Sequence, residues 1–191
     1  KVIVPSNPYD AKGLLKSAIR DDDPVIFMES EQMYGDKGEV PDEEYLLPIG
    51  VADIKRKGND VTIVSFGKII KEAFKAADEL EKENISCEII DLRTIRPLDY
   101  KVILESEKKT NRLVILEESW PFGNISTEVT QSVKEIRGPR LGAPENAIHG
   151  FLKKNKIERS ELQEKNTSKG SFYFYTRHVR TGLRFFLQWS P

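Results

Sequence analysis

The sequence predicts an α/β fold with a mostly parallel sheet. Apolar strand patterns alternate with amphipathic helix patterns through residues 51–136. The helix patterns are about 10 to 16 residues long, a length typical of the right-handed crossovers that join parallel strands. The 191-residue chain is 38% hydrophobic and 32% charged, which is the composition of a folded globular protein rather than of a disordered one.

The first 30 residues predict a strand, a helix and a second strand. Residues 2–4 form one apolar run and residues 25–28 form the other. Asn7 is the predicted N-cap of the helix, and Pro8 takes its first position. The helix is predicted to end at Arg20, because three aspartates and a proline follow. Helical spacing places five apolar residues on one face: Ala11, Leu14, Leu15, Ala18 and Ile19.

Residues 32–50 are the predicted connection between two domains, because they are acidic and contain glycine and proline. A domain over residues 51–136 follows. Its predicted strands are residues 61–66, 86–92 and 112–116, and its predicted helices are residues 68–83, 100–109 and 125–136.

The last part of the chain differs in charge and pattern. Residues 1–133 hold 18 basic and 26 acidic residues, whereas residues 134–191 hold 12 basic and 5 acidic ones. Residues 137–191, the tail, lose the strand and helix alternation, although residues 151–165 are compatible with a polar helix. The abrupt reversal favours the hypothesis that the tail is a frameshifted or mis-joined translation.

Few residues of the predicted α/β region carry an obvious chemistry. The glycine-rich phosphate-binding and nucleophile-elbow motifs are absent, and both histidines, His149 and His178, lie in the tail. The single cysteine, Cys87, excludes an internal disulfide and is predicted to be a packed core residue. Arg93 and Arg96 follow a strand end, where an anion site is one interpretation and a structural or interface role is the favoured one.

Two further groups are weaker candidates. Glu117 and Glu118 follow another strand end, but a paired-carboxylate mechanism needs a geometry that sequence does not give. The aromatic and basic tail residues match the composition of a single-stranded nucleic-acid surface: Phe172–Tyr175, Arg177, Arg180 and Arg184. No recognised module surrounds them, so nucleic acid is not expected as a partner. No apolar run of about 18 residues predicts a membrane span.

The end of the first helix combines unfavourable charges. A helix carboxyl end exposes unpaired carbonyls and carries partial negative charge, and three aspartates follow it here. A hard cation would relieve that conflict by binding carbonyl and carboxylate oxygens together. The other interpretation is a solvated acidic turn partly neutralised by Arg20, since such end effects are worth only about 0.3–1 kcal/mol.

Several separated motifs, in order, resemble those of one enzyme family. They are residues 1–6 (KVIVPS), 10–21 (DAKGLLKSAIRD), 24–27 (PVIF), 31–35 (EQMYG), 47–50 (LPIG), 91–99 (DLRTIRPLD) and 117–123 (EESWPFG). From Lys1 to about Val133 the chain resembles the beta subunits of the thiamin-diphosphate-dependent pyruvate dehydrogenase component. The branched-chain 2-oxo acid dehydrogenase beta subunits are close rivals, and a non-catalytic α/β assembly module is the alternative of another class.

The resemblance implies an architecture and an activity. Residues 1–31 would be the end of a pyrimidine-binding domain, and residues 51–136 an incomplete three-layer domain of the transketolase C-terminal type. Such beta subunits pair with alpha subunits in an α2β2 tetramer, with thiamin diphosphate and magnesium at the interfaces. The enzyme decarboxylates pyruvate and passes the acetyl unit to a lipoyl-bearing acyltransferase core. A cytoplasmic location is expected, or the mitochondrial matrix in a eukaryote.

The resemblance also implies where the active residues lie. The family's activating glutamate and its histidine would precede residue 1, so no catalytic or cofactor-binding residue is assigned, and the fragment alone is predicted to be inactive. A structural potassium ion is implied at Ala18, Ile19, Asp21 and Asp23. The family often has asparagine in place of Asp23, which weakens that ligand.

Overall fold

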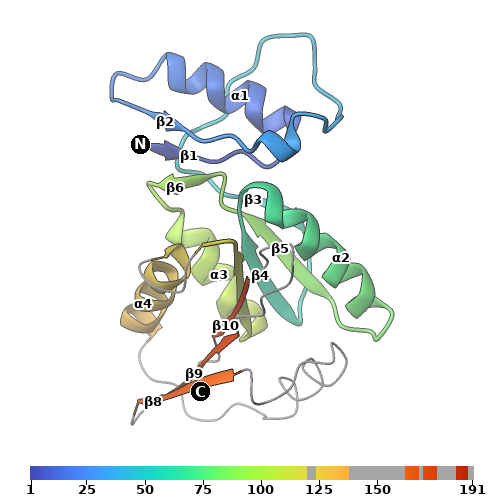
Figure 1. Cartoon of the computed structure of the whole chain (residues 1–191), viewed down its shortest axis with the longest axis vertical. Coiled ribbons are helices and arrows are strands. Elements are labelled where there is room, and N and C mark those ends of the chain that lie inside the picture. The colour runs from blue at the N-terminus through green and yellow to red at the C-terminus, as the bar shows by residue number, and fades with distance from the viewer. Residues whose placement is uncertain (120–123, 138–161, 168–169, 176–183, 189–191) are drawn as a thin grey trace.

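The computed structural model describes residues 1–119, 124–137, 162–167, 170–175 and 184–188. These residues form two stacked units (Figure 1). The small unit is a three-stranded sheet with one helix, and the large unit is a seven-stranded sheet with helices on both faces.

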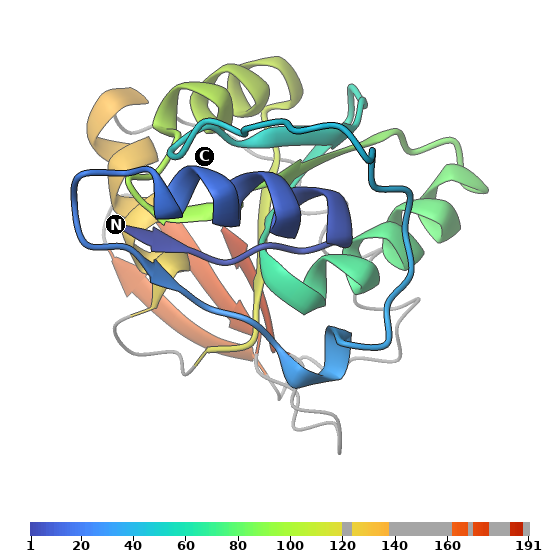
Figure 2. The same cartoon turned by 90° about the horizontal axis from the view of Figure 1, so that it is seen from above.

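The small unit begins as the sequence predicts. Its own elements are β1 (Val2–Ile3), α1 (Pro8–Ile19), β2 (Ile26–Phe27) and the 3-10 helix η1 (Glu31–Met33). Strand β2 pairs parallel with β1, and α1 runs along this sheet (Figure 2). The Asn7 side chain accepts a hydrogen bond from the Asp10 N–H at 2.8 Å, which confirms the predicted cap.

The large unit contains the predicted strands and helices and several others. Its elements are β3 (Asp53–Arg56), β4 (Val61–Ser65), η2 (Gly67–Ile69), α2 (Ile70–Glu81), β5 (Cys87–Asp91), β6 (Thr94–Arg96), α3 (Tyr100–Thr110), β7 (Leu113–Glu117), α4 (Ile125–Arg137), β8 (Leu162–Thr167), β9 (Gly170–Tyr175) and β10 (Arg184–Gln188). The sequence pattern does not indicate β3 and β6, because each strand is short and contains one apolar residue, Ile54 in β3 and Ile95 in β6.

The seven-stranded sheet has the order β3-β5-β4-β7-β10-β9-β8. Its central strands β5, β4 and β7 are parallel, but β3, β10, β9 and β8 pair antiparallel with their neighbours. The sheet is therefore mixed rather than mostly parallel. The reason for β8 and β9 is that only two residues separate them, too few for the crossover that parallel strands need.

Helices cover both faces of the central strands, which confirms the predicted three-layer α/β class. Helix α2 packs on one face, where Ile63 and Ile89 join its Ile70, Ala73 and Ala77. Helices α3 and α4 pack on the other face, against the alternate strand residues Val64, Ile90 and Ile115.

The tail differs from its prediction where it is described. Residues 162–165 lie in strand β8, so the polar helix is wrong there, and residues 151–161 lie outside the described residues. Strand β8 is polar in sequence, so its side chains show no strand pattern. Its place in the sheet comes from backbone pairing with β9. Strand β10 pairs with β7, with Arg184 opposite Glu117. The frameshift remains a hypothesis.

The structure describes only some of the other tail residues singled out in the sequence. Phe172–Tyr175 lies in β9, whereas Arg177, Arg180, His149 and His178 lie outside the described residues. None of the helices in the described residues combines the length and the hydrophobicity that a membrane span requires.

Candidate functional site

The two units share a sheet. Strand β6 follows β5 of the large unit in the chain, yet it pairs antiparallel with β1 of the small unit in the order β2-β1-β6. The Val4 N–H also donates to the Arg93 carbonyl at 2.8 Å. The large unit therefore supplies the strand that completes the sheet of the small unit.

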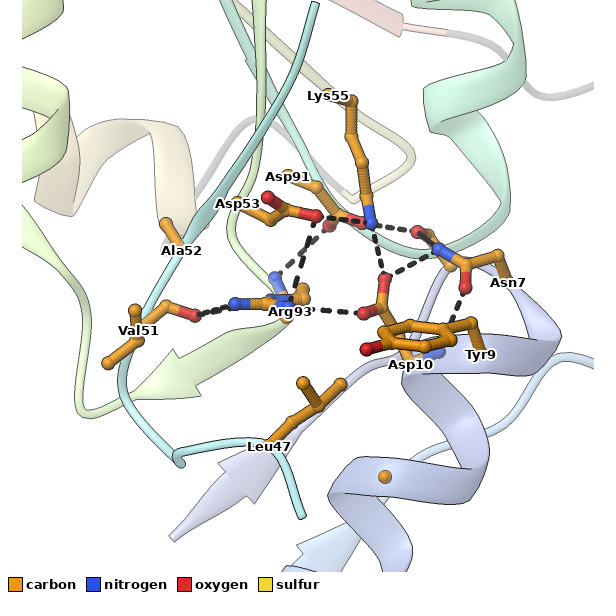
Figure 3. Close-up of polar contacts among 12 residues, drawn as sticks. Asn7, Tyr9, Asp10, Leu47, Val51, Ala52, Asp53, Lys55, Asp91 and Arg93 are labelled. Carbon is orange, nitrogen blue, oxygen red and sulfur yellow. Dashed lines mark hydrogen bonds and ion pairs between the residues drawn. The ribbon is translucent and has the colours of Figure 1, made fainter. Parts of the chain in front are cut away.

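A buried group of charges lies at this junction (Figure 3). Its five members, here called the joint cluster, are Asp10, Asp53, Lys55, Asp91 and Arg93. Helix α1 supplies Asp10, and β3 supplies Asp53 and Lys55. Asp91 is the last residue of β5, and Arg93 lies in the short connection between β5 and β6. Asp10 and Asp91 are 0% exposed and Arg93 is 6% exposed. Charges this deep must be paired or neutralised, because burial of an isolated charge is costly.

Arg93 is the residue that spans the joint. Its Nη1 lies 3.1 Å from Asp10 Oδ1, and its Nε and Nη2 donate to the Val51 carbonyl at 3.2 and 2.9 Å. Its φ of 55° is left-handed, a conformation that costs energy in a non-glycine residue and is held by surrounding contacts. The guanidinium binds carboxylates and one carbonyl of its own chain, so the structural role is the one observed. Arg96 is exposed on β6.

Lys55 closes the other side of the cluster. Its Nζ lies 2.6 Å from Asp10 Oδ2 and 2.6 Å from Asp53 Oδ2. Burial alone would lower the pKa of Lys55, but its contacts with these two carboxylates outweigh burial and raise it. Sequence reasoning missed Lys55, because it sits in a short polar run without a period. Asp10 is marked in the sequence only as the first residue of the motif at residues 10–21.

Asp91 is bound differently from the other two carboxylates. Ser6 Oγ donates to its Oδ2, and the Arg93 N–H donates to its Oδ1 at 3.1 Å. Burial raises the pKa of Asp91 to about 6, although the hydrogen bond from Ser6 and the charge of Lys55 act in the opposite direction. A carboxyl group with this pKa can gain or lose a proton under nearly neutral conditions.

The structure places an ammonium at the predicted potassium site. Lys1 Nζ lies 2.7 Å from Asp21 Oδ1 and 3.1 Å from Asp23 Oδ2, and this contact lowers the pKa of Asp21. The Ala18 carbonyl accepts from the Asp21 N–H at 3.3 Å, while the Ile19 side chain is exposed. The charge conflict that suggested a cation is thus met by a lysine.

The other sequence candidates are separate from the joint cluster. Cys87 is buried, and burial raises the pKa of its thiol to about 11, so it is a protonated core residue at neutral pH. Glu117 Oε1 accepts from the Ser126 N–H at 3.0 Å, whereas Glu118 pairs with Lys68 at 3.0 Å. The two adjacent carboxylates therefore bind different partners. The described residues contain no group of three or more His, Cys, Asp or Glu that could hold a metal ion.

Comparison with known families gives this architecture a name. Residues 50–151 match the family described as transketolase, C-terminal domain.

The chain belongs to the transketolase C-terminal domain family. Residues 1–37 match a second family, the transketolase pyrimidine-binding domain. The joint cluster thus connects the piece of pyrimidine-binding domain to the transketolase C-terminal domain. The match to the C-terminal domain also extends 18 residues beyond Val133, where the motif resemblance was placed at its end.

Three curated relatives of this transketolase-family chain are named as subunits of dehydrogenases. It is 47% identical over 145 residues to the pyruvate dehydrogenase E1 component subunit beta of Bacillus subtilis, covering 75% of this chain and 45% of that protein. The mitochondrial pyruvate dehydrogenase E1 component subunit beta-2 of Oryza sativa subsp. japonica is 51% identical over 154 residues, covering 78% of this chain and 41% of that protein. The 2-oxoisovalerate dehydrogenase subunit beta of Bacillus subtilis is 47% identical over 151 residues, which cover 78% and 46%. The chain spans less than half the length of these relatives.

A solved structure agrees with the transketolase fold. It is titled "Split gene transketolase, inactive beta4 tetramer", and it is 26% identical to this chain with a TM-score of 0.60. The likeness covers 72% of this chain and 45% of that one. The predicted fold, a pyrimidine-binding end followed by a transketolase C-terminal domain, is therefore confirmed.

Proposed function

We propose that the chain is the C-terminal part of the beta subunit of a pyruvate dehydrogenase component. The observation that carries the proposal is the identity of 47–51%, over 145 to 154 residues, with relatives of that name. In this proposal the whole enzyme decarboxylates pyruvate with thiamin diphosphate and transfers the acetyl unit to a lipoyl-bearing acyltransferase. The fragment by itself is inactive.

Other substrates have support of similar strength. One relative named for 2-oxoisovalerate is 47% identical over 151 residues, and one named for acetoin is 48% identical over 144 residues, both from Bacillus subtilis. Pyruvate is preferred on the motif at Met33–Gly35. The coding sequence upstream of Lys1 distinguishes the candidates, because the substrate pocket is expected there. A start codon directly before Lys1 would instead favour the non-catalytic assembly module.

The proposed cofactor is thiamin diphosphate with magnesium, shared with an alpha subunit in an α2β2 tetramer. A pyrimidine-binding match and relatives named as beta subunits support this assignment. In the part of the chain that the structure describes, no group of three or more His, Cys, Asp or Glu residues is arranged to hold the metal. In this proposal the chain has a scaffolding role and no step of the reaction, because the resemblance implies that the active residues precede residue 1. The proposed location is the cytoplasm or the mitochondrial matrix, since the relatives include a bacterial protein and one named as mitochondrial.

The proposal is tested with a chimeric beta subunit. Residues 1–133 replace the matching part of the Bacillus subtilis subunit that is 47% identical, and the chimera is expressed with the alpha subunit of that bacterium. We expect a purified heterotetramer that oxidises pyruvate in the presence of thiamin diphosphate and magnesium, measured with an artificial electron acceptor. The chain itself with alpha subunit should show no activity above alpha alone. A folded chimera that fails to bind alpha would contradict the proposal.

A structural potassium ion at the end of α1 is also proposed, on the resemblance. Carbonyl and carboxylate oxygens are suitable donors for it, but Lys1 competes for Asp21 and Asp23. Potassium, compared with tetramethylammonium at equal ionic strength, is expected to raise the melting temperature by about 1–4 °C. The rise should be larger in Lys1→Met, which removes the competitor. Melting is measured by circular dichroism. The site would be contradicted if the parent chain and Lys1→Met each melted at the same temperature in potassium as in tetramethylammonium.

A further inference from the structure

The joint cluster is unbalanced in charge. It contains three carboxylates, Asp10, Asp53 and Asp91, but only two cations, Lys55 and Arg93. The two carboxylates at its centre, Asp10 and Asp91, are fully buried, whereas Asp53 is partly exposed. With every group ionised, the cluster would hold one uncompensated negative charge in a buried joint, an arrangement that favours uptake of a proton.

The contacts indicate which carboxylate takes that proton. Asp10 is contacted by both cations, and Asp53 lies 2.6 Å from Lys55. In the described part of the chain no cation lies within ion-pair distance of Asp91, which accepts from the neutral Ser6 hydroxyl and the Arg93 N–H. Its neighbours across the sheet are Asp53 on β3 and the uncharged Ser65 on β4. Lys55 acts on Asp91 only through space, and Asp10 opposes ionisation.

Opening the joint would change this environment. Ser6 and Asp10 belong to the small unit, whereas Asp91 ends β5 of the large unit. Separation of the two units therefore removes the hydrogen bond from Ser6 and exposes Asp91 to solvent. A protonated Asp91 can itself donate to Ser6 Oγ across the joint, so the protonated form retains the cross-joint contact without the excess charge.

We propose that the joint cluster is a proton-linked latch, which takes up one proton at Asp91 when the two units close and releases it when they separate. The device regulates how tightly the pyrimidine-binding end is held to the transketolase C-terminal domain. Mild acid tightens the joint, and neutral to alkaline conditions loosen it.

The direction follows from linkage. The pKa of Asp91 is raised from 3.8 to about 6 in the closed form. Because this pKa is raised, protonation of Asp91 stabilises the closed form fully below pH 3.8, and this stabilisation is lost as the pH rises through about 6. The difference between these two pKa values corresponds to a change of roughly a hundredfold in the equilibrium constant for closing. About tenfold of this change falls between pH 5 and pH 7.5.

Hydrogen exchange of the whole chain tests the latch. The Val4 amide bonds to the Arg93 carbonyl across the joint, so its protection factor reports closing. We expect this factor, corrected for the intrinsic exchange rate, to fall about tenfold from pH 5 to pH 7.5. Amides of the β4–β5 ladder, inside the large unit, should not follow it. A Val4 protection factor that is constant over this range would overturn the proposal.

Variants assign the effect to a residue. In Asp91→Asn the Val4 protection factor is expected to be independent of pH, and in Asp53→Asn, where the charges balance, the change should move to lower pH. Asp42→Asn, at an exposed position of the connection, is the matched control and should behave as the parent chain does. If Asp91→Asn does not fold, the carboxyl carbon of Asp91 is followed by carbon-13 NMR in the parent chain. A midpoint near 4 there would refute the latch.

Discussion

Replacing Arg93 with methionine is expected to lower the free energy of unfolding by about 3 kcal/mol, the low end of the range for breaking a buried ion pair. The substitution keeps the apolar stem but leaves Asp10 with Lys55 as its remaining cation, and it deprives the Val51 carbonyl of two donors. Because Arg93 belongs to one unit and Asp10 to the other, the small unit should separate first. Urea unfolding measured by circular dichroism gives the total loss.

Arg96→Met is the matched control for this change. Arg96 is three residues away on β6 and is exposed, so its loss should alter stability by no more than about 0.5 kcal/mol. Equal effects of the two substitutions would show that the ion pair with Asp10 does not hold the joint. A double-mutant cycle, in which Asp10 and Arg93 are substituted singly and together, measures the coupling energy between them. This energy should be well above zero, because the two groups are in contact.

Gly58→Ala is expected to be about as damaging, for a steric reason. A Cβ atom on Gly58 would lie 2.2 Å from the carbonyl carbon of Cys87 and 2.3 Å from the nitrogen of Glu88. Both are backbone atoms of the central strand β5, which cannot move without disturbing its pairing with β4. We expect a loss of about 3 kcal/mol, at the upper end for an overpacked site, measured as the shift of the urea midpoint.

Gly35→Ala provides the comparison at a position with space. A Cβ atom there meets nothing within 4 Å, so the stability should stay within about 0.5 kcal/mol of the parent chain. If Gly58→Ala were equally harmless, the turn between β3 and β4 would have to lie farther from β5 than the structure places it.

Local signals explain what the sequence could predict. Asn7 and Pro8 mark the start of α1, and apolar runs mark β4 and β5, because each of these features is contained within a few neighbouring residues. Strands β3 and β6 were missed since their pairing depends on distant partners rather than on their own short, polar sequences.

The joint cluster was beyond sequence reasoning for the same cause. Asp10 lies 45 residues from Lys55 and 83 residues from Arg93, and no local pattern brings the three together. The sequence marks Arg93 as a residue at a strand end, but it does not indicate that Asp10 is its partner. Asp91 reads as an ordinary polar strand end. Only the fold shows that it is buried beside a hydroxyl instead of a cation.

Strand β6 makes the domain limits along the chain differ from those in space. A protein cut near residue 50, between the two matched families, would lose β1 and leave β6 with an unpaired edge. It would also leave Arg93 without the carboxylate of Asp10. Unpaired strand edges promote self-association. Expression of the transketolase C-terminal domain alone is therefore best begun at β1, so that the edge stays covered.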